Sequence, residues 1–178
     1  LRAENLSVPG LLDNVSFSLH AGEILGITGL MGAGKTEVAK TIFGVFGKGT
    51  PKSTGNVYLF GEKLDIHTPQ DAIAKKIGLV PENRAVEGLL TEMSIVDNVI
   101  LASLDKVSKH GWIDQRKVDQ TMDEMIQSLE IKCGNPQNPV NSLSGGNQQK
   151  IVLAKWLAAK SQIVIFDEPT RGIDVGAK

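Results

Sequence analysis

The first part of the chain contains several short apolar runs, one of them alternating with polar residues, of the kind that form β-strands. Residues 15–19 alternate with a period of two, and residues 55–61 form a short apolar run that begins and ends with glycine. Residues 22–28 read as a turn followed by a short apolar strand, whereas residues 76–81 have the composition of a buried strand. We therefore expect residues 1 to about 65 to be rich in strands.

Helical periodicity interrupts this pattern at residues 37–43 and becomes dominant between about 91 and 142. Thr68, which is followed by proline, is typical of the start of a short helix, and Ser94 can cap another. A longer amphipathic helix is predicted to begin after Asp114. Its apolar face consists of Val118, Met122, Met125, Ile126 and Leu129. A stripe of this kind that contains methionine belongs to a core more often than to a surface that binds a partner.

The last stretch joins an almost completely apolar helix to an apolar strand. Residues 151–159 are apolar around most of the helix circumference, which predicts a largely buried helix. The lysines in and beside this helix are expected to reach the surface: Lys150, Lys155 and Lys160. Residues 163–166 are four consecutive apolar residues without alternation, a pattern typical of a central parallel strand that is buried on both faces. Strands and helices in this order predict an α/β fold.

Composition narrows the possible functions. The chain has 178 residues, of which 41% are hydrophobic and 22% charged, as in an ordinary globular domain with a sizeable core. Its 19 Lys and Arg nearly balance its 20 Asp and Glu, so no global attraction to nucleic acid or to a membrane is implied. The single Cys133 excludes a disulfide framework and favours a reducing cytoplasm. No apolar run approaches the length of about 18–20 residues that spans a bilayer.

Residues 29–36 match the phosphate-binding P-loop pattern G-x-x-x-x-G-K-[ST]. They read Gly29, Leu30, Met31, Gly32, Ala33, Gly34, Lys35 and Thr36. Glycines let the backbone take left-handed conformations and turn its N–H groups toward phosphate oxygens. Lys35 would reach the β- and γ-phosphates of a nucleotide, and the Thr36 hydroxyl would bind Mg²⁺. A chance glycine-rich turn is the alternative, but the predicted strand before the loop and helix after it favour the P-loop.

Two acidic residues follow the last apolar strand, at the carboxyl end where open α/β sheets bind their ligands. Asp167 would hold Mg²⁺ together with Thr36, in the Walker B role. Glu168 would orient or deprotonate the water molecule that attacks the γ-phosphate. The alternative is a polar turn that ends a strand. P-loop chemistry needs an acid on a neighbouring strand, which favours the first interpretation.

Ser144, Gly145 and Gly146 precede the apolar helix and form a third candidate site. A serine followed by two glycines at the start of a helix offers a hydroxyl, several N–H groups and the helix dipole to an anion. On local sequence alone, a plain helix cap is the simpler interpretation. The order of the parts favours the anion site, because it lies between the P-loop and the paired acids.

This order of motifs resembles the ATPase domain of ABC transporters. Residues 143–150 are similar to the signature motif of bacterial importers of monosaccharides of the ribose, galactose and xylose type, in which two such domains are fused in tandem. Residues 29–34 and 167–178 are similar to the second half of that tandem. The joint pattern covers the chain from its first strand to just past the Walker B acids.

The resemblance implies an α/β P-loop NTPase fold with a RecA-like core, an antiparallel β subdomain and an inserted α-helical subdomain. It implies one ABC ATPase domain over residues 1–178, with a nucleotide-binding core at 1–90 and 151–178. The helical subdomain with the signature motif would be residues 91–150. The family's switch histidine would lie beyond the last residue, so we expect a fragment, truncated at the C-terminus, that binds nucleotide better than it hydrolyses it.

The resemblance also implies an ATPase that powers sugar import, with ATP and Mg²⁺ as ligands. Two such domains close head-to-tail, each binding the ATP held by the other. The residues that would cross to the partner's ATP are Ser144, Gly145, Gly146 and Asp174. Closure would drive transmembrane permease subunits that receive sugar from a periplasmic binding protein. The implied location is peripheral, on the cytoplasmic face of the inner membrane, and no nucleic-acid partner is expected.

Glu82 stands where the family's core usually has a glutamine that touches Mg²⁺ and the attacking water, and its carboxylate could still bind the metal. No aromatic residue precedes Phe17, so the usual adenine-stacking side chain is missing. Glu168 and Lys35 remain the expected catalytic residues.

Two other interpretations stay open: an impaired half that mainly lends its signature motif to a partner site, and a soluble ABC ATPase acting on DNA or ribosomes. The latter should show a basic surface or coiled-coil heptads, and the sequence contains neither.

Overall fold

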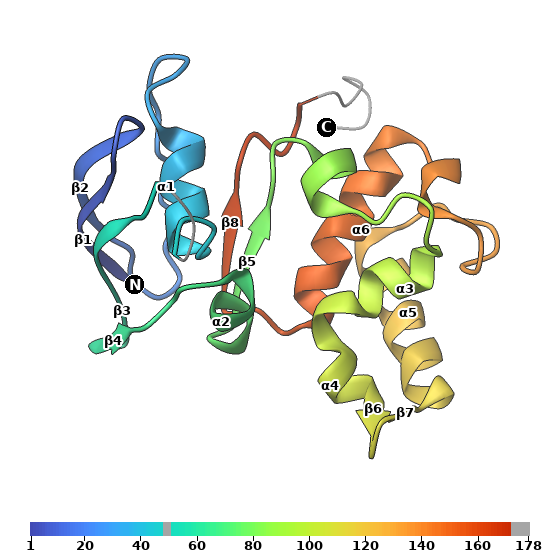
Figure 1. Ribbon diagram of the computed structural model, residues 1–178. Coiled ribbons are helices and arrows are strands. Elements are labelled where there is room, and N and C mark those ends of the chain that lie inside the picture. Colours follow the sequence, from blue (N-terminus) through green and yellow to red (C-terminus); the bar gives the residue numbers. More distant parts are fainter. Residues whose placement is uncertain (48–50, 172–178) are drawn as a thin grey trace. The chain divides into compact units, whose positions relative to one another are not determined.

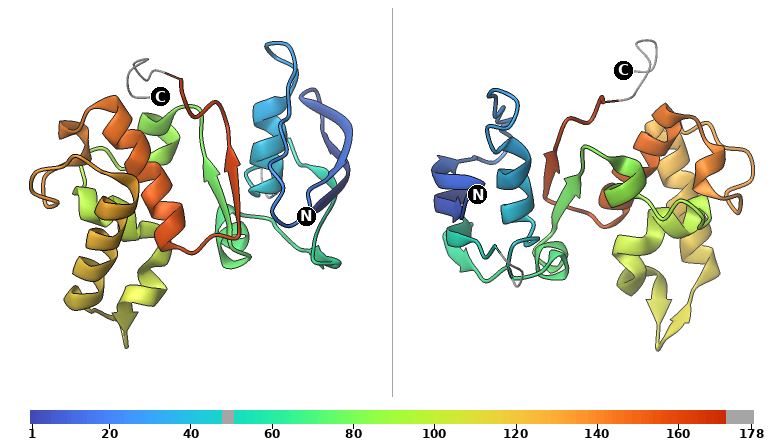
Figure 2. Two further views of the ribbon diagram at one scale, coloured as in Figure 1. Left: turned by 180° about the vertical axis from the view of Figure 1, so that it is seen from behind. Right: turned by 45° about the horizontal axis from the view of Figure 1, so that its top comes forward.

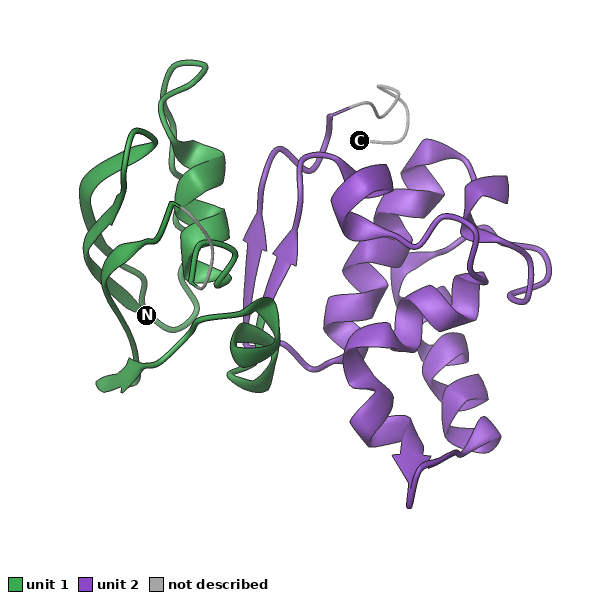
Figure 3. Cartoon of the chain, viewed as in Figure 1, with its two compact units in different colours: residues 1–77 green, residues 78–178 purple. Residues whose placement is uncertain are grey.

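The structure is a computed structural model that describes residues 1–47 and 51–171 (Figure 1). Its helices and strands gather into two compact units, Leu1–Ile77 and Gly78–Lys178, which Figure 3 colours separately.

Unit 1 contains an antiparallel four-stranded sheet with the strand order β2-β1-β3-β4. Its strands are β1 (Arg2–Val8), β2 (Leu12–Ser18), β3 (Thr54–Leu59) and β4 (Glu62–Leu64). The alternation of buried residues on β1 breaks between Ala3 and Leu6, where the pairing with β2 shifts register and Asn5 has a left-handed φ of 53°. A bulge of this kind inserts one residue and returns the following apolar side chains to the buried face. The predicted strands at 15–19 and 55–61 are confirmed.

Unit 1 also contains the helices α1 (Lys35–Ile42) and α2 (Pro69–Ala74). The buried side chains of α1 face β1 and β2. The start of α2 follows the predicted signal: Thr68 Oγ1 accepts a hydrogen bond from Asp71 N (3.3 Å) and donates one to Asp71 Oδ2 (2.8 Å). This reciprocal pairing satisfies a backbone N–H that would otherwise lack a partner at the helix start.

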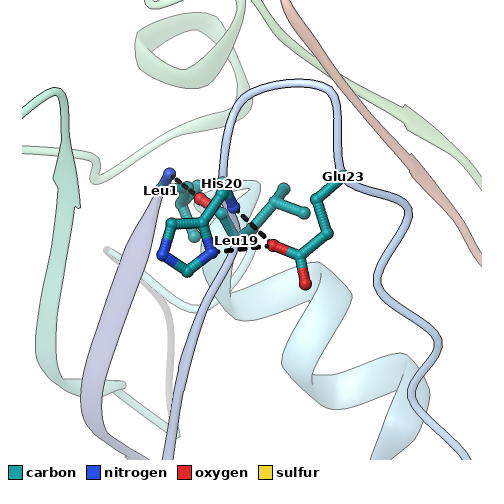
Figure 4. Close-up of polar contacts among 4 residues, drawn as sticks. All are labelled: Leu1, Leu19, His20 and Glu23. Carbon is teal, nitrogen blue, oxygen red and sulfur yellow. Dashed lines mark hydrogen bonds and ion pairs between the residues drawn. The ribbon is translucent and has the colours of Figure 1, made fainter.

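The chain leaves β2 through a tight turn that Figure 4 shows in detail. The backbone nitrogen of Leu1 donates to the carbonyl oxygen of Leu19 (2.7 Å). The Glu23 carboxylate accepts a hydrogen bond from His20 N (2.6 Å) and lies 3.0 Å from His20 Nδ1. The backbone hydrogen bond from His20 is the main cause that lowers the pKa of Glu23 below its usual value.

The strand predicted at residues 22–28 is wrong. Residues 23–30 have no regular structure, and Ile24 is 99% exposed. An apolar run becomes a strand only where a neighbouring strand completes its backbone hydrogen bonds. None of the sheets in the described residues includes this segment, so its composition alone does not produce a strand.

Unit 2 contains a two-stranded sheet of β5 (Ile77–Val80), which starts at the last residue of unit 1, and β8 (Ile163–Phe166). The arrows of the two strands point the same way and stay side by side in both views of Figure 2. All four residues of β5 are buried, as its sequence predicts. The prediction that 163–166 is buried on both faces is wrong, because these residues are only partly buried and Phe166 is 52% exposed. With β5 as its neighbour on one side only, β8 is an edge strand of this sheet.

The rest of unit 2 is helical apart from one small hairpin. Its elements are η1 (Arg84–Gly88, a π-helix turn), α3 (Ile95–Ile100), η2 (Leu101–Ser103), α4 (Leu104–Val107), β6 (Ser108–Lys109), β7 (Trp112–Ile113), α5 (Gln115–Leu129), η3 (Val140–Ser142) and α6 (Gly145–Ala158). The core of this unit forms around α6, which contacts α3, α5, η1 and η2. No helix among the described residues has the length and apolar character needed to cross a membrane.

The helix starts predicted in unit 2 are confirmed. Ser94 accepts a hydrogen bond from Asp97 N (3.1 Å) at the start of α3, and Asp114 accepts one from Arg116 N (3.2 Å) at the start of α5. Of the apolar stripe predicted on α5, Val118 and Met122 are buried and the remaining residues are partly buried or at the boundary with solvent. The stripe therefore packs into the core through its first half.

Candidate functional site

The glycine-rich loop of residues 29–36 forms the start of α1 in unit 1. Gly34 occupies the N-cap position with φ 85° and ψ 11°, and Gly32 has φ 77°. A Cβ atom on Gly34 would lie 3.1 Å from the carbonyl oxygen of Leu11, so both conformation and space favour glycine there. No side chain caps α1, which leaves the N–H groups of its first turn available to an external acceptor.

The Lys35 side chain folds back over this loop. Its Nζ donates hydrogen bonds to the carbonyl oxygens of Gly29 and Leu30, each at 3.2 Å. The ammonium group is therefore held at the loop whose N–H groups would bind phosphate. Leu30 and Met31 are 85% and 101% exposed, so the loop is open to solvent. Thr36, the second residue of α1, places a hydroxyl at the same helix start.

The two acids of the Walker B position follow β8 in unit 2. Asp167 is buried, and its N–H donates to the carbonyl oxygen of Val80 (2.9 Å), which continues the pairing of β8 with β5. Glu168 is exposed and has a left-handed φ of 44°. The N–H of Arg171 donates to the carbonyl oxygen of Glu168 (3.0 Å), so residues 168–171 form a closed turn.

Glu82 lies in the loop after β5, within the same unit. Its carboxylate forms an ion pair with the Arg171 guanidinium, a partner that the sequence did not predict. Among the described residues, no three His, Cys, Asp or Glu side chains gather in a way that could hold a metal ion. A hydroxyl from Thr36 and a carboxylate from Asp167 or Glu82 are nevertheless the hard oxygen donors that Mg²⁺ prefers.

The segment Ser144–Gly146 starts α6. Ser144 has the extended conformation of an N-cap residue, but its side chain accepts no capping hydrogen bond. Instead, Asn147 Nδ2 donates to Ser144 Oγ (3.0 Å), and the Ser144 residue is exposed. The hydroxyl therefore lies at the surface at the helix start and does not cap the helix.

The expected residues are divided between the two units. The P-loop residues 29–36 belong to unit 1, whereas Glu82, Ser144–Gly146, Asp167 and Glu168 belong to unit 2. Asp174 lies outside the described residues. The predicted core at 1–90 and 151–178 and helical subdomain at 91–150 remain predictions.

Arg84, Arg171 and Lys155 have partners that the sequence does not reveal, because those partners are remote along the chain. Arg84 bonds to Arg171, 87 residues away, and Lys155 donates to the carbonyl oxygen of Gly88, 67 residues away. Lys155 was expected at the surface, and this prediction is wrong: the residue is only 8% exposed. Its place inside an otherwise apolar helix segment is the one signal that could have indicated burial.

The glycine-capped loop before α1 and the acids after β8 define a P-loop nucleotide-binding protein of the α/β class. The chain belongs to the ABC transporter family, which matches residues 12–171. The fold is similar to a nucleotide-free ATP-binding cassette from an ABC transporter, with a TM-score of 0.78 and 21% identity over 99% of this chain and 71% of that one. It is also similar to a dimeric post-hydrolysis cassette bound to ADP and Pi, with a TM-score of 0.75 and 22% identity over 99% and 77% of the two chains.

Relatives similar in sequence have names that refer to sugar import. The chain is 46% identical over 178 residues to the ribose import ATP-binding protein RbsA of Lacticaseibacillus paracasei, covering 100% of this chain and 35% of the relative. It is 48% identical over 178 residues to a putative ribose/galactose/methyl galactoside import ATP-binding protein of Rhizobium etli, covering 100% and 33%. The chain thus spans about a third of the length of these curated relatives.

Proposed function

We propose that this chain is an ATP-binding and ATP-hydrolysing domain that powers the import of a sugar through a membrane permease. The observation on which this rests is the Lys35 ammonium, held by the carbonyl oxygens of Gly29 and Leu30 at a glycine-capped helix start. A cation and a set of free backbone N–H groups at one loop form a site for a polyphosphate. The names of the sugar-import relatives supply the transport role.

Each predicted residue has a role in this proposal. Residues 29–36 bind the phosphates, with Lys35 on the β- and γ-phosphates. Thr36 and Asp167 are the residues that would hold Mg²⁺, which neutralises phosphate charge when bound. Glu82 is the remaining candidate oxygen ligand, but its carboxylate is already paired with the Arg171 guanidinium. Glu168 orients or deprotonates the attacking water, and its exposed carboxylate is free of the core.

The proposal includes a second ATPase domain as partner. Ser144, Gly145, Gly146 and Asp174 would bind the ATP held by that partner, and the exposed Ser144 hydroxyl supports this use. Nucleotide that binds the closed pair better than the open pair shifts the population toward closure, and hydrolysis removes this preference. Closure at the cytoplasmic face of the membrane would drive the transmembrane subunits between their inward- and outward-facing states. A periplasmic binding protein would supply these subunits with sugar.

The first test is the binding of MgATP to the chain by titration calorimetry. We expect micromolar or tighter binding for the parent, and a loss of about tenfold or more for Lys35→Ala, which corresponds to about 1.4 kcal/mol. Lys63→Ala, which removes an exposed lysine on β4 outside the P-loop, should bind as the parent does. A folded parent that does not bind MgATP would exclude the nucleotide site and favour the half that only lends its signature motif.

A second measurement separates a hydrolysing domain from the impaired half. Glu168→Gln in the complete transport ATPase should preserve MgATP binding and abolish the turnover at this site. Turnover that persists at the parent rate would show that only the partner site hydrolyses ATP.

A further inference from the structure

Two arginines and a glutamate connect three separate segments of unit 2. We call Glu82, Arg84 and Arg171 the arginine brace. Arg171 forms an ion pair with Glu82, so the turn after β8 is joined to the loop after β5. Arg84 Nη1 donates to the carbonyl oxygen of Arg171 (3.1 Å), which joins the same two segments a second time.

The brace also reaches the start of the signature helix. Arg84 Nε donates to Gln148 Oε1 (3.4 Å), a residue in the first turns of α6. The amide of Gln148 is itself oriented, because its Nε2 donates to the carbonyl oxygen of Leu143 (3.1 Å). A guanidinium group is planar and has five N–H donors, so one arginine can hold two acceptors in fixed directions, which a lysine cannot do.

The loop after β5 is fixed to α6 at its other end as well. Arg84–Gly88 form a turn of π-helix, a rare conformation that is frequently found at functional sites. At the end of this turn, Lys155 Nζ donates to the carbonyl oxygen of Gly88 (2.7 Å). A Cβ atom on Gly88 would lie only 3.1 Å from Val152 Cγ2, which shows how closely the turn packs on α6. The loop and the helix are therefore joined at two points, Gln148 and Lys155.

The energetics of the brace favour a role in positioning. The Arg171 and Glu82 side chains are 65% and 28% exposed, and an ion pair with this much solvent contributes little to stability. Its effect on geometry is larger, because the turn 168–171 is closed by the hydrogen bond from Arg171 N to the carbonyl oxygen of Glu168. Any restraint on Arg171 therefore acts on Glu168, which already has the unusual φ of 44°.

We propose that the arginine brace positions Glu168 and makes its turn move together with the signature helix α6. Arg84 and Arg171 are positioning residues in this proposal, and Glu82 serves as the anion that holds Arg171. The proposal rests on the proposed function, in which Glu168 acts on the attacking water. The proposal also explains why a carboxylate can stand at position 82, since Arg171 neutralises the charge of Glu82.

The test in the complete transport ATPase is a charge exchange. Glu82→Arg and Arg171→Glu should each lower kcat about tenfold or more, while the KM for MgATP changes less than about twofold, because the P-loop is untouched. The double variant with both changes restores the opposite charges and should return kcat to within about threefold of the parent. Arg84→Gln should lower kcat as much as the single variants do. Arg84→Lys, which keeps the charge but not the planar guanidinium, should lower kcat as well. Arg116→Gln, on the exposed side of α5, is the control.

Hydrogen exchange of the chain itself gives a readout that does not depend on turnover. Arg84→Gln should accelerate exchange of the amides in 168–171 and 82–88 and leave α5 unchanged. The brace is overturned if the double variant is no more active than the single variants. A shifted Mg²⁺ requirement in Glu82→Arg would then identify Glu82 as a metal ligand. Unchanged exchange in 168–171 would also overturn the brace. The proposed function fails separately, if the parent does not bind MgATP or if Glu168→Gln still turns over.

Discussion

Replacing Lys155 with methionine should remove a rise in stability that the parent shows between neutral and alkaline pH. Lys155 lies on α6 and is only 8% exposed. Its Nζ donates to the carbonyl oxygen of Gly88 (2.7 Å) and lies 4.8 Å from the centre of the Trp156 ring. Burial lowers the pKa of Lys155 from 10.5 to about 8, because the charged form loses hydration.

The sign and size of the effect follow from linkage. Between pH 8 and 10.5 the unfolded chain binds the lysine proton and the folded chain has largely released it, so the free energy of unfolding increases with pH in this window. For these two pKa values, the rise between pH 7 and pH 10 is about 2.5 kcal/mol. Methionine has a similar shape and no proton to release, so this contribution should vanish in Lys155→Met.

The comparison must be one of slopes, because two effects oppose each other at pH 7. Methionine removes the cost of the buried charge, but it leaves the Gly88 carbonyl without its donor, which costs about 1–3 kcal/mol. The assay is urea unfolding at pH 7 and pH 10, followed by tryptophan fluorescence in a Trp112→Phe background. Trp112 is 79% exposed and Trp156 is 4% exposed, so the remaining signal reports the core around Lys155.

Lys160→Met is the matched control, because Lys160 is exposed just after the same helix and should keep the alkaline rise of the parent. Equal pH dependence in the parent and in Lys155→Met would refute the reasoning, since it would mean that the buried lysine titrates like a solvated one.

Two further substitutions test the packing and the local signals of unit 2. Gly78→Ala should lower the free energy of unfolding by about 1–3 kcal/mol, because the new Cβ would lie 2.8 Å from the Trp156 ring; urea unfolding measures this, and Gly134→Ala, with nothing within 4 Å, should be near neutral. Ser94→Ala should cost about 1 kcal/mol by removing the cap of Asp97 N, and the reasoning would be contradicted if the urea midpoint did not move.

The parts of the fold that the sequence predicted correctly depend on contacts within a few residues. Thr68, Ser94 and Asp114 cap their helices through N–H groups two or three residues away, so the signal and its partner lie in one short window. The predicted helix start after the glycine-rich loop is equally local: Gly34 adopts the left-handed N-cap conformation, and Lys35 bonds to Gly29 and Leu30 of the same loop.

The features that the sequence did not predict depend on partners far along the chain. The buried Lys155 ammonium donates a hydrogen bond to the carbonyl oxygen of Gly88 in η1. No local sequence pattern around α6 reveals that this acceptor lies there. Residues 22–28 have the composition of a strand, but a strand needs a neighbour, and the described sheets offer them none. From the local sequence, Arg171 would be taken for a solvated surface charge. In the fold it pairs with Glu82, and its carbonyl oxygen accepts a hydrogen bond from Arg84.

The fold of the Lys35 side chain over its own loop has an entropic consequence. A free lysine side chain has about 2 kcal/mol of rotamer entropy, which it loses when a ligand immobilises it. In the folded loop, the hydrogen bonds to Gly29 and Leu30 already restrict the side chain. Much of that ordering is therefore part of folding, and in the proposed function a phosphate would meet a preorganised cation at the loop. Such a side chain loses less conformational entropy on association than a freely rotating lysine does. The affinity is therefore higher without any additional contact.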